Sequence, residues 1–305
     1  MKKYLITMLS IVMMISILTG CGQNNSSENH KKSEDTKSGE EEKIASLSIH
    51  LTNDLLALGI TPAGSVVGGA LKDFLPHVKE DLKNTEKLGS VKDPNMEALL
   101  ALKPDAIYLD KEYSGSDVNQ FEKIAETHVF DLDKGTWRDH LKEIAKIVDR
   151  EKEANQFIKD YEEEAKEVKS LIQKELGEHN STMAIRVTAK ELRVFTTKRP
   201  MGPILFEDLG LTPASKVKEL DQTQPYEVIS QEVLPDFDAD AIFVVVNEDD
   251  QSQTAFKELE KSPIWKGLKA VKNEHVYVVP EQPWLDYSAL GNKLALDDAK
   301  ELFNK

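Results

Sequence analysis

The arginines of this chain are concentrated in one short segment. The sequence has five arginines, and three of them, Arg186, Arg193 and Arg199, lie within IRVTAKELRVFTTKR. Arginine suits fixed, bidentate contacts with carboxylates and similar oxygen groups. Arg199 also precedes a short helix predicted over 203–209, whose free N–H groups favour anions. The segment predicts an anion-facing cleft wall, carried by Arg186 and Arg199; the alternative is that alternate positions of a hairpin simply face solvent.

Two aromatic side chains lie in a C-terminal loop rich in polar and turn-forming residues. They are Trp284 and Tyr287, in the segment EQPWLDYSALG. Aromatic side chains in such a loop can stack on a bound ligand. Packing of one lobe against another explains them almost as well, so both interpretations stay open.

Other kinds of chemistry leave no recognisable pattern in the sequence. The seven histidines are scattered and none has metal-ligand spacing such as His-x-x-x-His, which disfavours direct capture of a bare divalent ion. There is no Gly-x-Ser-x-Gly segment, no phosphate-binding glycine loop and no pair of cysteines. Solvated helix faces explain the many acidic residues. We therefore expect a binding protein rather than an enzyme, without a cofactor and without direct metal ligands.

The element that organises the chain is a long helix predicted from Glu151 to Leu176. The segment contains no Gly or Pro and is dense in Glu, Lys and Ala, all good helix formers. Gly177 follows where a helix stop is expected. Apolar residues recur at spacings of three and four and form one narrow stripe: Ala154, Ile158, Tyr161, Ala165, Val168 and Ile172. A helix of this length spans about 39 Å. We interpret it as a strut laid along two lobes; a coiled-coil seam is the alternative.

Short strands and helices alternate on both sides of this helix, which favours parallel sheets covered by helices. Before it, strands are predicted at 44–49, 106–109 and 127–130, a turn followed by a further strand within 60–67, and helices at 52–59, 94–102, 121–126 and 136–148. After it, strands are predicted at 183–187, 192–195, 241–246 and 276–279, the last of them preceded by 265–271, and helices at 203–209, 228–234 and 290–303. The two halves also echo each other: 94–109 and 226–245 both read as helix, Pro, Asp-Ala-Ile and strand, with Glu97 and Glu232 before the Pro.

The N-terminus carries targeting features. Lys2 and Lys3 precede an apolar run that ends in Leu-Thr-Gly-Cys21, which is typical of a secretory signal and too short for a spanning helix. The position of Cys21 resembles the bacterial lipobox, in which the cysteine is lipidated and begins the mature chain. Residues 22–43 contain no aliphatic or aromatic side chain and have nothing to bury. We therefore expect a disordered tether that holds the folded part off the membrane.

The charge of the chain excludes some partners. The formal net charge is −15, and removal of residues 1–20, which carry two lysines and no acid, makes it −17. Such a surface does not favour nucleic acid or anionic lipid. Membrane attachment would therefore come from acyl chains on Cys21.

Taken together, the lipobox, the polar tether, the two α/β halves and the long helix resemble the siderophore-binding lipoproteins of bacterial ABC importers, a class that includes ferric-hydroxamate, ferric-citrate and cobalamin binders. Five segments carry further resemblance: 48–60, 94–108, 141–162, 186–211 and 283–303. The resemblance implies an α/β fold of two Rossmann-like lobes joined by one long rigid helix, with the ligand cleft between the lobes.

The resemblance also implies roles for particular residues. Family members clamp a preassembled ferric chelate between the lobes with modest closure. An acidic residue on each lobe docks on the permease, and the matching positions are Glu97 and Glu232. The basic residues that face the chelate fall at Arg186 and Arg199.

Two departures from the family pattern affect these expectations. Relatives usually have an extra strand before the first loop, but Glu40 to Lys43 passes straight into Ile44, which leaves the edge of the first sheet open. Some relatives present an Arg after the strand at 106–109, where this chain has Lys111 and Tyr113. We therefore expect Lys111 and Tyr113 to contribute to the ligand site from the first lobe.

The sequence thus predicts an extracytoplasmic, lipid-anchored receptor that captures a ferric siderophore and delivers it to an ABC permease dimer for iron uptake. The expected boundaries are 1–20 for the signal peptide, 21–43 for the tether, 44–150 for the N-terminal lobe, 151–177 for the connecting helix and 178–305 for the C-terminal lobe. One alternative is a receptor of the same fold for haem or a corrinoid, with Tyr113, Tyr226 or Tyr287 as an axial ligand of haem. A surface-anchored enzyme or adhesin is the alternative from another class.

Overall fold

The computed structural model describes residues 42–68, 72–112, 118–178 and 180–304. All of them belong to one compact unit, Glu41–Lys305. The predicted signal peptide, Cys21 and the predicted tether up to residue 41 lie outside the described residues, and so does Tyr113.

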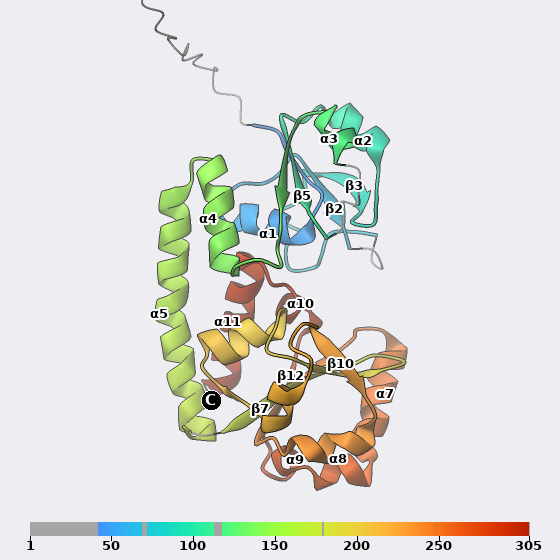
Figure 1. Ribbon diagram of the computed structural model, residues 1–305, viewed down its shortest axis with the longest axis vertical. Helices are drawn as coiled ribbons and strands as arrows, with labels where there is room; N and C mark the ends of the chain where they lie inside the picture. Colours follow the sequence, from blue (N-terminus) through green and yellow to red (C-terminus); the bar gives the residue numbers. More distant parts are fainter. Residues whose placement is uncertain (1–41, 69–71, 113–117, 179, 305) are drawn as a thin grey trace, which may run out of the picture. The chain divides into compact units, whose positions relative to one another are not determined.

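The N-terminal lobe (N-lobe) is built on a six-stranded sheet with the strand order β4-β3-β2-β1-β5-β6. Its strands are β1 (Ile44–Ser46), β2 (Gly64–Val67), β3 (Glu86–Ser90), β4 (Asp93–Pro94), β5 (Ala106–Asp110) and β6 (Glu126–Phe130), and its helices are α1 (Ile49–Ala57), α2 (Met96–Leu102), α3 (Asn119–Glu122) and α4 (Trp137–Ile147) (Figure 1). All neighbours are parallel except β3 and β4. The β1 strand lies inside the sheet, between β2 and β5, so the edges are formed by β4 and β6.

The C-terminal lobe (C-lobe) contains the second sheet, with the order β10-β8-β7-β11-β12 and β9 paired to β7. Its strands are β7 (Ser181–Val187), β8 (Leu192–Phe195), β9 (Thr212–Pro213), β10 (Tyr226–Ile229), β11 (Ala241–Val246) and β12 (Val276–Val279). Its helices are the π-helix η1 (Pro203–Asp208), α6 (Ser215–Glu219), the 3₁₀-helix η2 (Gln231–Phe237), α7 (Asp250–Lys261), α8 (Pro263–Gly267), α9 (Lys269–Lys272), α10 (Glu281–Trp284) and α11 (Ala289–Phe303). The predicted strands are present, but β7–β8 and β8–β10 are antiparallel, so this sheet is mixed.

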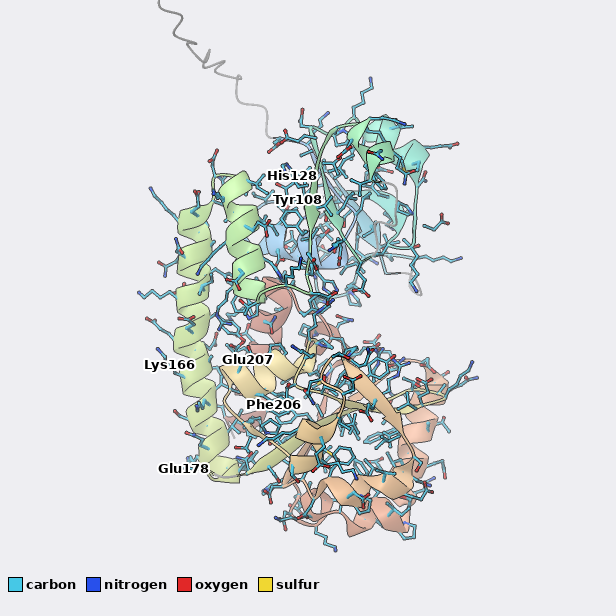
Figure 2. All side chains as sticks on the ribbon, in the orientation of Figure 1. Tyr108, His128, Lys166, Glu178, Phe206 and Glu207 are labelled. Atoms are coloured by element: carbon cyan, nitrogen blue, oxygen red, sulfur yellow. The ribbon has the colours of Figure 1, made fainter. Side chains whose placement is uncertain are left out.

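The predicted long helix is confirmed as α5 (Glu151–Leu176), which runs alongside α4 and α11 (Figure 1). Its buried residues are the six of the predicted stripe: Ala154, Ile158, Tyr161, Ala165, Val168 and Ile172. These side chains belong to one hydrophobic core that also includes Leu51 of the N-lobe and Phe243 of the C-lobe. The opposite side is charged, and Lys166 is exposed there (Figure 2). One helix face therefore packs on both lobes, as the strut interpretation requires.

The start of α1 differs from the prediction. The helix begins at Ile49, where the Ser48 side chain accepts a hydrogen bond from the backbone N–H of Leu51. The predicted cap residues Thr52, Asn53 and Asp54 lie inside the helix and are almost completely buried. Their polar side chains are used in tertiary contacts rather than as a local cap, and Thr52, for example, bonds Ser65 of β2 at 2.6 Å.

The prediction of a helix at 228–234 is also wrong in part. Tyr226–Ile229 forms the edge strand β10, in which Val228 is paired with Arg193 of β8, and only the following residues turn into the 3₁₀-helix η2. The long-range strand pairing overrides the local helical pattern. The predicted echo between the halves is nevertheless present, because α2 leads through Pro104 into β5 and η2, with Pro235 inside it, leads into β11.

Among the described helices, none has the length and apolar character needed to cross a membrane.

Candidate functional site

The two lobes meet at a buried carboxylate that precedes α11. Asp286 is 4% exposed, and its Oδ1 lies 2.9 Å from Nδ1 of His50. Its Oδ2 accepts a hydrogen bond from the Asn53 side chain at 2.5 Å and lies 3.6 Å from Nε2 of His77. We call these four side chains the Asp286 cluster. Three of them belong to the N-lobe, so the cluster ties that lobe to the start of α11.

Electrostatics keep Asp286 ionised in spite of its burial. Burial on its own raises the pKa of a carboxyl, but the contacts with His50, His77 and Asn53 outweigh it and hold the pKa of Asp286 well below its usual range. The backbone around Asp286 is also constrained, by its close approach to Gly291. A Cβ atom at Gly291 would lie 2.3 Å from the Asp286 carbonyl oxygen, so only glycine allows this loop to fold back on α11.

A second buried carboxylate lies beside the cluster. Asp54 of α1 is 2% exposed and accepts a hydrogen bond from the backbone N–H of Ala289, the first residue of α11, at 2.7 Å. Burial raises the pKa of Asp54; the Ala289 N–H opposes this rise and the charge of Asp286 adds to it. A backbone N–H at the start of α11 thus has its hydrogen-bond acceptor in the N-lobe.

Arg199 lies at the same junction and faces the N-lobe. Its Nε donates a hydrogen bond to Oδ1 of Asp133 at 3.1 Å, and its Nη2 donates to the same oxygen and to Oε2 of Glu112 at 3.2 Å. The Arg199 guanidinium stacks over the Tyr287 ring at 4.1 Å, and that ring stacks on His50 at 3.6 Å. We call Glu112, Asp133, Arg199 and Tyr287 the Arg199 cluster.

The segment after β8 fixes the position of Arg199. The Thr196 side chain accepts a hydrogen bond from the Lys198 N–H at 3.2 Å, and the Gly202 N–H donates to the Lys198 carbonyl at 3.0 Å. A Cβ atom at Gly202 would come within 2.1 Å of the Thr197 carbonyl, so this turn excludes any side chain there. Asp133 and Tyr287 together raise the pKa of Arg199 despite its burial, and it stays charged.

Arg186 is positioned within the C-lobe. Its Nε donates a hydrogen bond to the Asn247 side chain at 2.7 Å, and its Nη2 donates to Oε1 of Glu281 at 2.5 Å. Burial lowers its pKa, and the Glu281 charge opposes that effect. The third arginine of the segment, Arg193, bonds Glu191 at 2.6 and 2.8 Å and stacks on Tyr226 at 4.3 Å. Each arginine of the predicted cleft wall is therefore already paired with a carboxylate of this chain.

The remaining predicted ligand residues are placed differently. Lys111 follows β5, is largely exposed and donates a hydrogen bond to Asp131 at 2.8 Å, which raises its pKa. Tyr113 lies outside the described residues. Trp284 is only 1% exposed; it packs on Phe243, and its indole N–H donates to Asp298 at 2.7 Å. The expectation that Trp284 stacks on a ligand is therefore not met in this structure, because the ring belongs to the hydrophobic core shared by the two lobes.

The two predicted docking acids are both exposed and both lie in the first turn of a helix. Glu97 belongs to α2, and Asn95 caps that helix by accepting from the N–H groups of Glu97 and Ala98. Glu232 belongs to η2, where its own backbone N–H and the Ser230 hydroxyl lower its pKa. Each lobe thus presents one exposed acid at equivalent points of the internal echo.

Metal ligation receives no support from the part of the chain that the structure describes, where no group of three or more His, Cys, Asp or Glu could hold a metal ion. Scattered histidines take other partners; His128, for example, packs edge-on against Tyr108 in the N-lobe (Figure 2).

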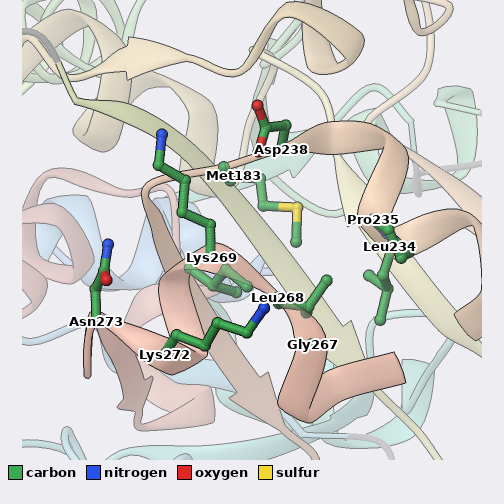
Figure 3. Close-up of a pocket in the computed structure, with 11 residues that line it drawn as sticks. Met183, Leu234, Pro235, Asp238, Gly267, Leu268, Lys269, Lys272 and Asn273 are labelled. Atoms are coloured by element: carbon green, nitrogen blue, oxygen red, sulfur yellow. The ribbon is translucent and has the colours of Figure 1, made fainter. Parts of the chain in front are cut away.

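A cavity of about 370 Å³ lies within the C-lobe (Figure 3). Buried Met183, Leu234 and Ile242 form its apolar lining, and Lys269 and Lys272 add basic groups. Lys269 already pairs with Asp240 at 2.6 Å. The cavity shares no residue with the lobe junction, so we assign the candidate site to the junction and not to the cavity.

Several residues of the junction were missed by sequence reasoning: His50, Asn53, Asp54, Glu112, Asp133 and Asp286. The signal that could have revealed some of them is the run Thr52-Asn53-Asp54 within an otherwise apolar segment, because three polar residues inside a helix need partners from elsewhere. The partners of Asn53 and Asp54, which are Asp286 and Ala289, lie 233 and 235 positions away, and nothing local indicates them.

This architecture matches a known family. The periplasmic binding protein family matches residues 44–283, which include both sheets, α5 and, from the Arg199 cluster, Glu112, Asp133 and Arg199. The chain therefore belongs to the periplasmic binding protein family.

Curated relatives align over almost the whole chain. A probable siderophore-binding lipoprotein of Bacillus subtilis, YfiY, is 29% identical, with 100% of this chain and 99% of the relative covered. The iron-uptake system-binding protein of the same organism is 27% identical, with 93% and 92% covered.

Solved structures of similar fold also cover most of the chain. SirA of Staphylococcus aureus in complex with staphyloferrin B has a TM-score of 0.75 and 26% identity, with 86% of this chain and 93% of that chain covered. FeuA of Bacillus subtilis in complex with ferri-bacillibactin has a TM-score of 0.71 and 28% identity, with 86% and 92% covered.

Proposed function

We propose that this chain is a lipid-anchored receptor on the extracytoplasmic face of the cell membrane, which captures a ferric siderophore between its two lobes and delivers it to an ABC permease for iron uptake. The observation that carries the proposal is the lobe junction itself. There, two lobes held by one long helix bring Arg199 of the C-lobe against the carboxyl ends of β5 and β6 of the N-lobe. In open α/β sheets, ligands bind outside the carboxyl ends of strands.

The proposed mechanism is capture without covalent chemistry. Arg186 and Arg199 pair with oxygen atoms of the chelate, Tyr287 covers part of it, and Lys111 and Tyr113 contribute from the N-lobe. Full-length relatives that are named as siderophore-binding and iron-uptake proteins support this cargo. The protein adds no ligand to the iron, since the chelate arrives with its metal already coordinated.

Anchoring and delivery complete the proposal. Cys21 carries the acyl chains that hold the receptor at the membrane, and the residues before Ile44 form the tether. Glu97 and Glu232 meet basic residues of the two permease subunits. Names of relatives as lipoproteins of ABC transporters support the anchor. If Cys21 is the anchor, Cys21→Ser abolishes incorporation of radioactive palmitate in cells and releases the protein from the membrane fraction; retained label would exclude Cys21.

Capture is tested by quenching of the intrinsic fluorescence of Trp137, Trp265 and Trp284 during titration with ferric citrate, ferrioxamine B, a ferric tricatecholate, haem and cobalamin. We expect at least one ferric chelate to bind. Arg199→Gln removes a charged hydrogen-bond donor and should weaken that binding by roughly one to two decades. A response to haem or cobalamin alone would overturn the proposed cargo.

A matched arginine variant separates a site effect from a general effect of charge. Arg150 precedes α5 and is exposed, and its side chain makes a long contact with the Asp149 carbonyl, at 3.4 Å. Arg150→Gln makes the same change of side chain outside the lobe junction. Equal loss of affinity in both variants would remove Arg199 from the site.

A further inference from the structure

Two acidic residues of the N-lobe accept hydrogen bonds from Arg199, the arginine that we assign to chelate binding. Asp133 accepts from both Nε and Nη2 of Arg199, and Glu112 accepts from Nη2 at 3.2 Å. One face of the guanidinium is covered by the Tyr287 ring at 4.1 Å. An anionic oxygen that pairs with the Nε and Nη2 groups of Arg199 would therefore compete with the two carboxylates that these groups already bond.

The scaffold holds both acids in place. Glu112 follows the end of β5, where the buried Asp110 accepts a hydrogen bond from the Glu112 N–H at 3.0 Å. Asp133 follows the end of β6, in a turn closed by the Lys134 N–H and the Asp131 carbonyl at 3.0 Å. Since β5 and β6 are adjacent and parallel, their carboxyl ends deliver the two acids to one point.

The charges at this point do not favour an anion. Arg199 contributes one positive charge, and Asp133 and Glu112 contribute two negative charges within hydrogen-bond distance of it. The side chains of both acids are largely exposed, at 66% and 47%, so they can move away or be displaced without disturbing the core. An anionic ligand that bonds Nε and Nη2 of Arg199 must displace them and is repelled by them, whereas a cationic ligand is attracted by them.

From this geometry we propose that Asp133 and Glu112 are specificity-determining residues, which occupy Arg199 in the empty receptor and weaken the binding of anionic chelates relative to cationic ones. The inference rests on the proposed function and adds to it that two carboxylates of the chain itself select between chelates by their charge. The same ion pairs of Arg199 with Asp133 and Glu112 also link the two lobes before a ligand binds.

The test is the double variant Asp133→Asn with Glu112→Gln, which keeps the shape of both side chains and removes both charges. Its affinity is compared with that of the wild type for ferric citrate, an anionic chelate, and for ferrioxamine B, which carries an ammonium group. We expect the Kd for ferric citrate to fall by roughly twofold to tenfold, as for the loss of two exposed competing ion pairs. The Kd for ferrioxamine B should stay the same or rise.

The control is Glu162→Gln with Glu163→Gln on α5. Glu162 is half-exposed and bonds Arg138 at 3.2 Å, so this variant also removes two exposed charges, one of them paired with an arginine. It should leave both Kd values unchanged. An unchanged ratio of the two Kd values in the double variant at 112 and 133, or an equal change in the control, would overturn the inference.

A second measurement does not depend on ligand. Hydrogen exchange of the empty full chain should be faster in the double variant for peptides that cover 196–203, because Arg199 loses its partners in the N-lobe. Unchanged exchange there would contradict the interlobe link. A wild-type chain that binds no chelate of the panel overturns the proposed function instead, and the two failures are thus told apart.

Discussion

The Oδ1 atom of Asp286 lies 2.9 Å from Nδ1 of His50, although 236 positions separate the two residues in the sequence. His50 belongs to α1 of the N-lobe, and Asp286 comes directly before α11 of the C-lobe. The lobes are therefore connected by a buried polar contact in addition to α5. Tyr287 extends this contact, since it stacks on His50 and lies under Arg199, which links the Asp286 cluster to the proposed ligand site.

Removal of the Asp286 charge should destabilise the protein. In Asp286→Asn, the partly buried His50 and His77 lose a buried, ionised partner, and the expected loss is about 3 kcal/mol in the free energy of unfolding at pH 7, measured with urea. Because the pKa of Asp286 is lower in the folded chain than in the unfolded chain, the wild-type advantage is present above about pH 4 and decreases as the pH falls further.

The matched control is Asp297→Asn, which makes the same change on a half-exposed residue of α11 that pairs with Lys293. An exposed pair of this kind contributes at most about 1 kcal/mol. Similar losses in the two variants would show that the buried contact between Asp286 and His50 contributes no more than a surface pair.

Asp54 should have the opposite dependence on pH. Burial raises its pKa above the value in the unfolded chain, so its contribution to stability is complete below about pH 4 and is lost as the pH rises through the folded-state pKa. Asp54→Asn stays neutral, and its Oδ1 can still accept from the Ala289 N–H. We therefore expect the variant to gain stability relative to the wild type between pH 4 and pH 8, measured by urea unfolding. A difference that does not vary with pH would contradict an elevated pKa.

The buried stripe of α5 can be tested independently of the site. Ile172 is completely buried in the core shared by the two lobes, and Ile172→Ala should cost about 3 kcal/mol in the free energy of unfolding. Lys166→Ala, on the exposed side of the same helix, should change it by less than about 0.5 kcal/mol. A small effect at Ile172 would mean that α5 does not depend on this face for its packing.

The fold could be predicted where local pattern and tertiary packing agree. The buried stripe of α5 follows from a 3.6-residue period, and its end follows from Gly177. The closing helix α11 also has a clear start, where the Ser288 side chain caps it. The prediction failed at 228–234, where β10 exists only because β8 offers it a partner more than thirty positions earlier. Strand pairing at such distance has no local signature.

The candidate site could be predicted only in part, for a similar reason. The arginine-rich segment identified Arg186 and Arg199 by residue type, and the structure brings Arg199 to the lobe junction. Its partners Glu112 and Asp133 are ordinary loop acids in the sequence, in a chain that has 54 acidic residues. Only the parallel pairing of β5 and β6 distinguishes them from the others. For Trp284, the sequence predicts a ring that can reach a ligand, but the ring is buried in the structure. The composition of a loop does not reveal which of its side chains are buried.

The proposed docking role of Glu97 and Glu232 leads to a prediction that separates capture from delivery. Both acids are exposed, and they lie on different lobes, in α2 and η2, so charge reversal should leave the lobe junction intact. Glu97→Lys and Glu232→Lys should keep the wild-type Kd for the ferric chelate. Each should weaken docking by roughly tenfold or more, because a lysine would face the basic residues of the permease.

The measurement is uptake of a radioactive ferric chelate by cells in which the variant replaces the wild-type chain, together with the Kd of the purified variant. Glu163→Lys is the matched control, since Glu163 is an exposed acid of α5 that pairs only loosely with Lys159, at 3.8 Å. We expect normal uptake with this control and reduced uptake with each docking variant. Normal uptake with both docking variants would remove these acids from the permease contact, and a parallel loss of chelate affinity would assign them to capture instead.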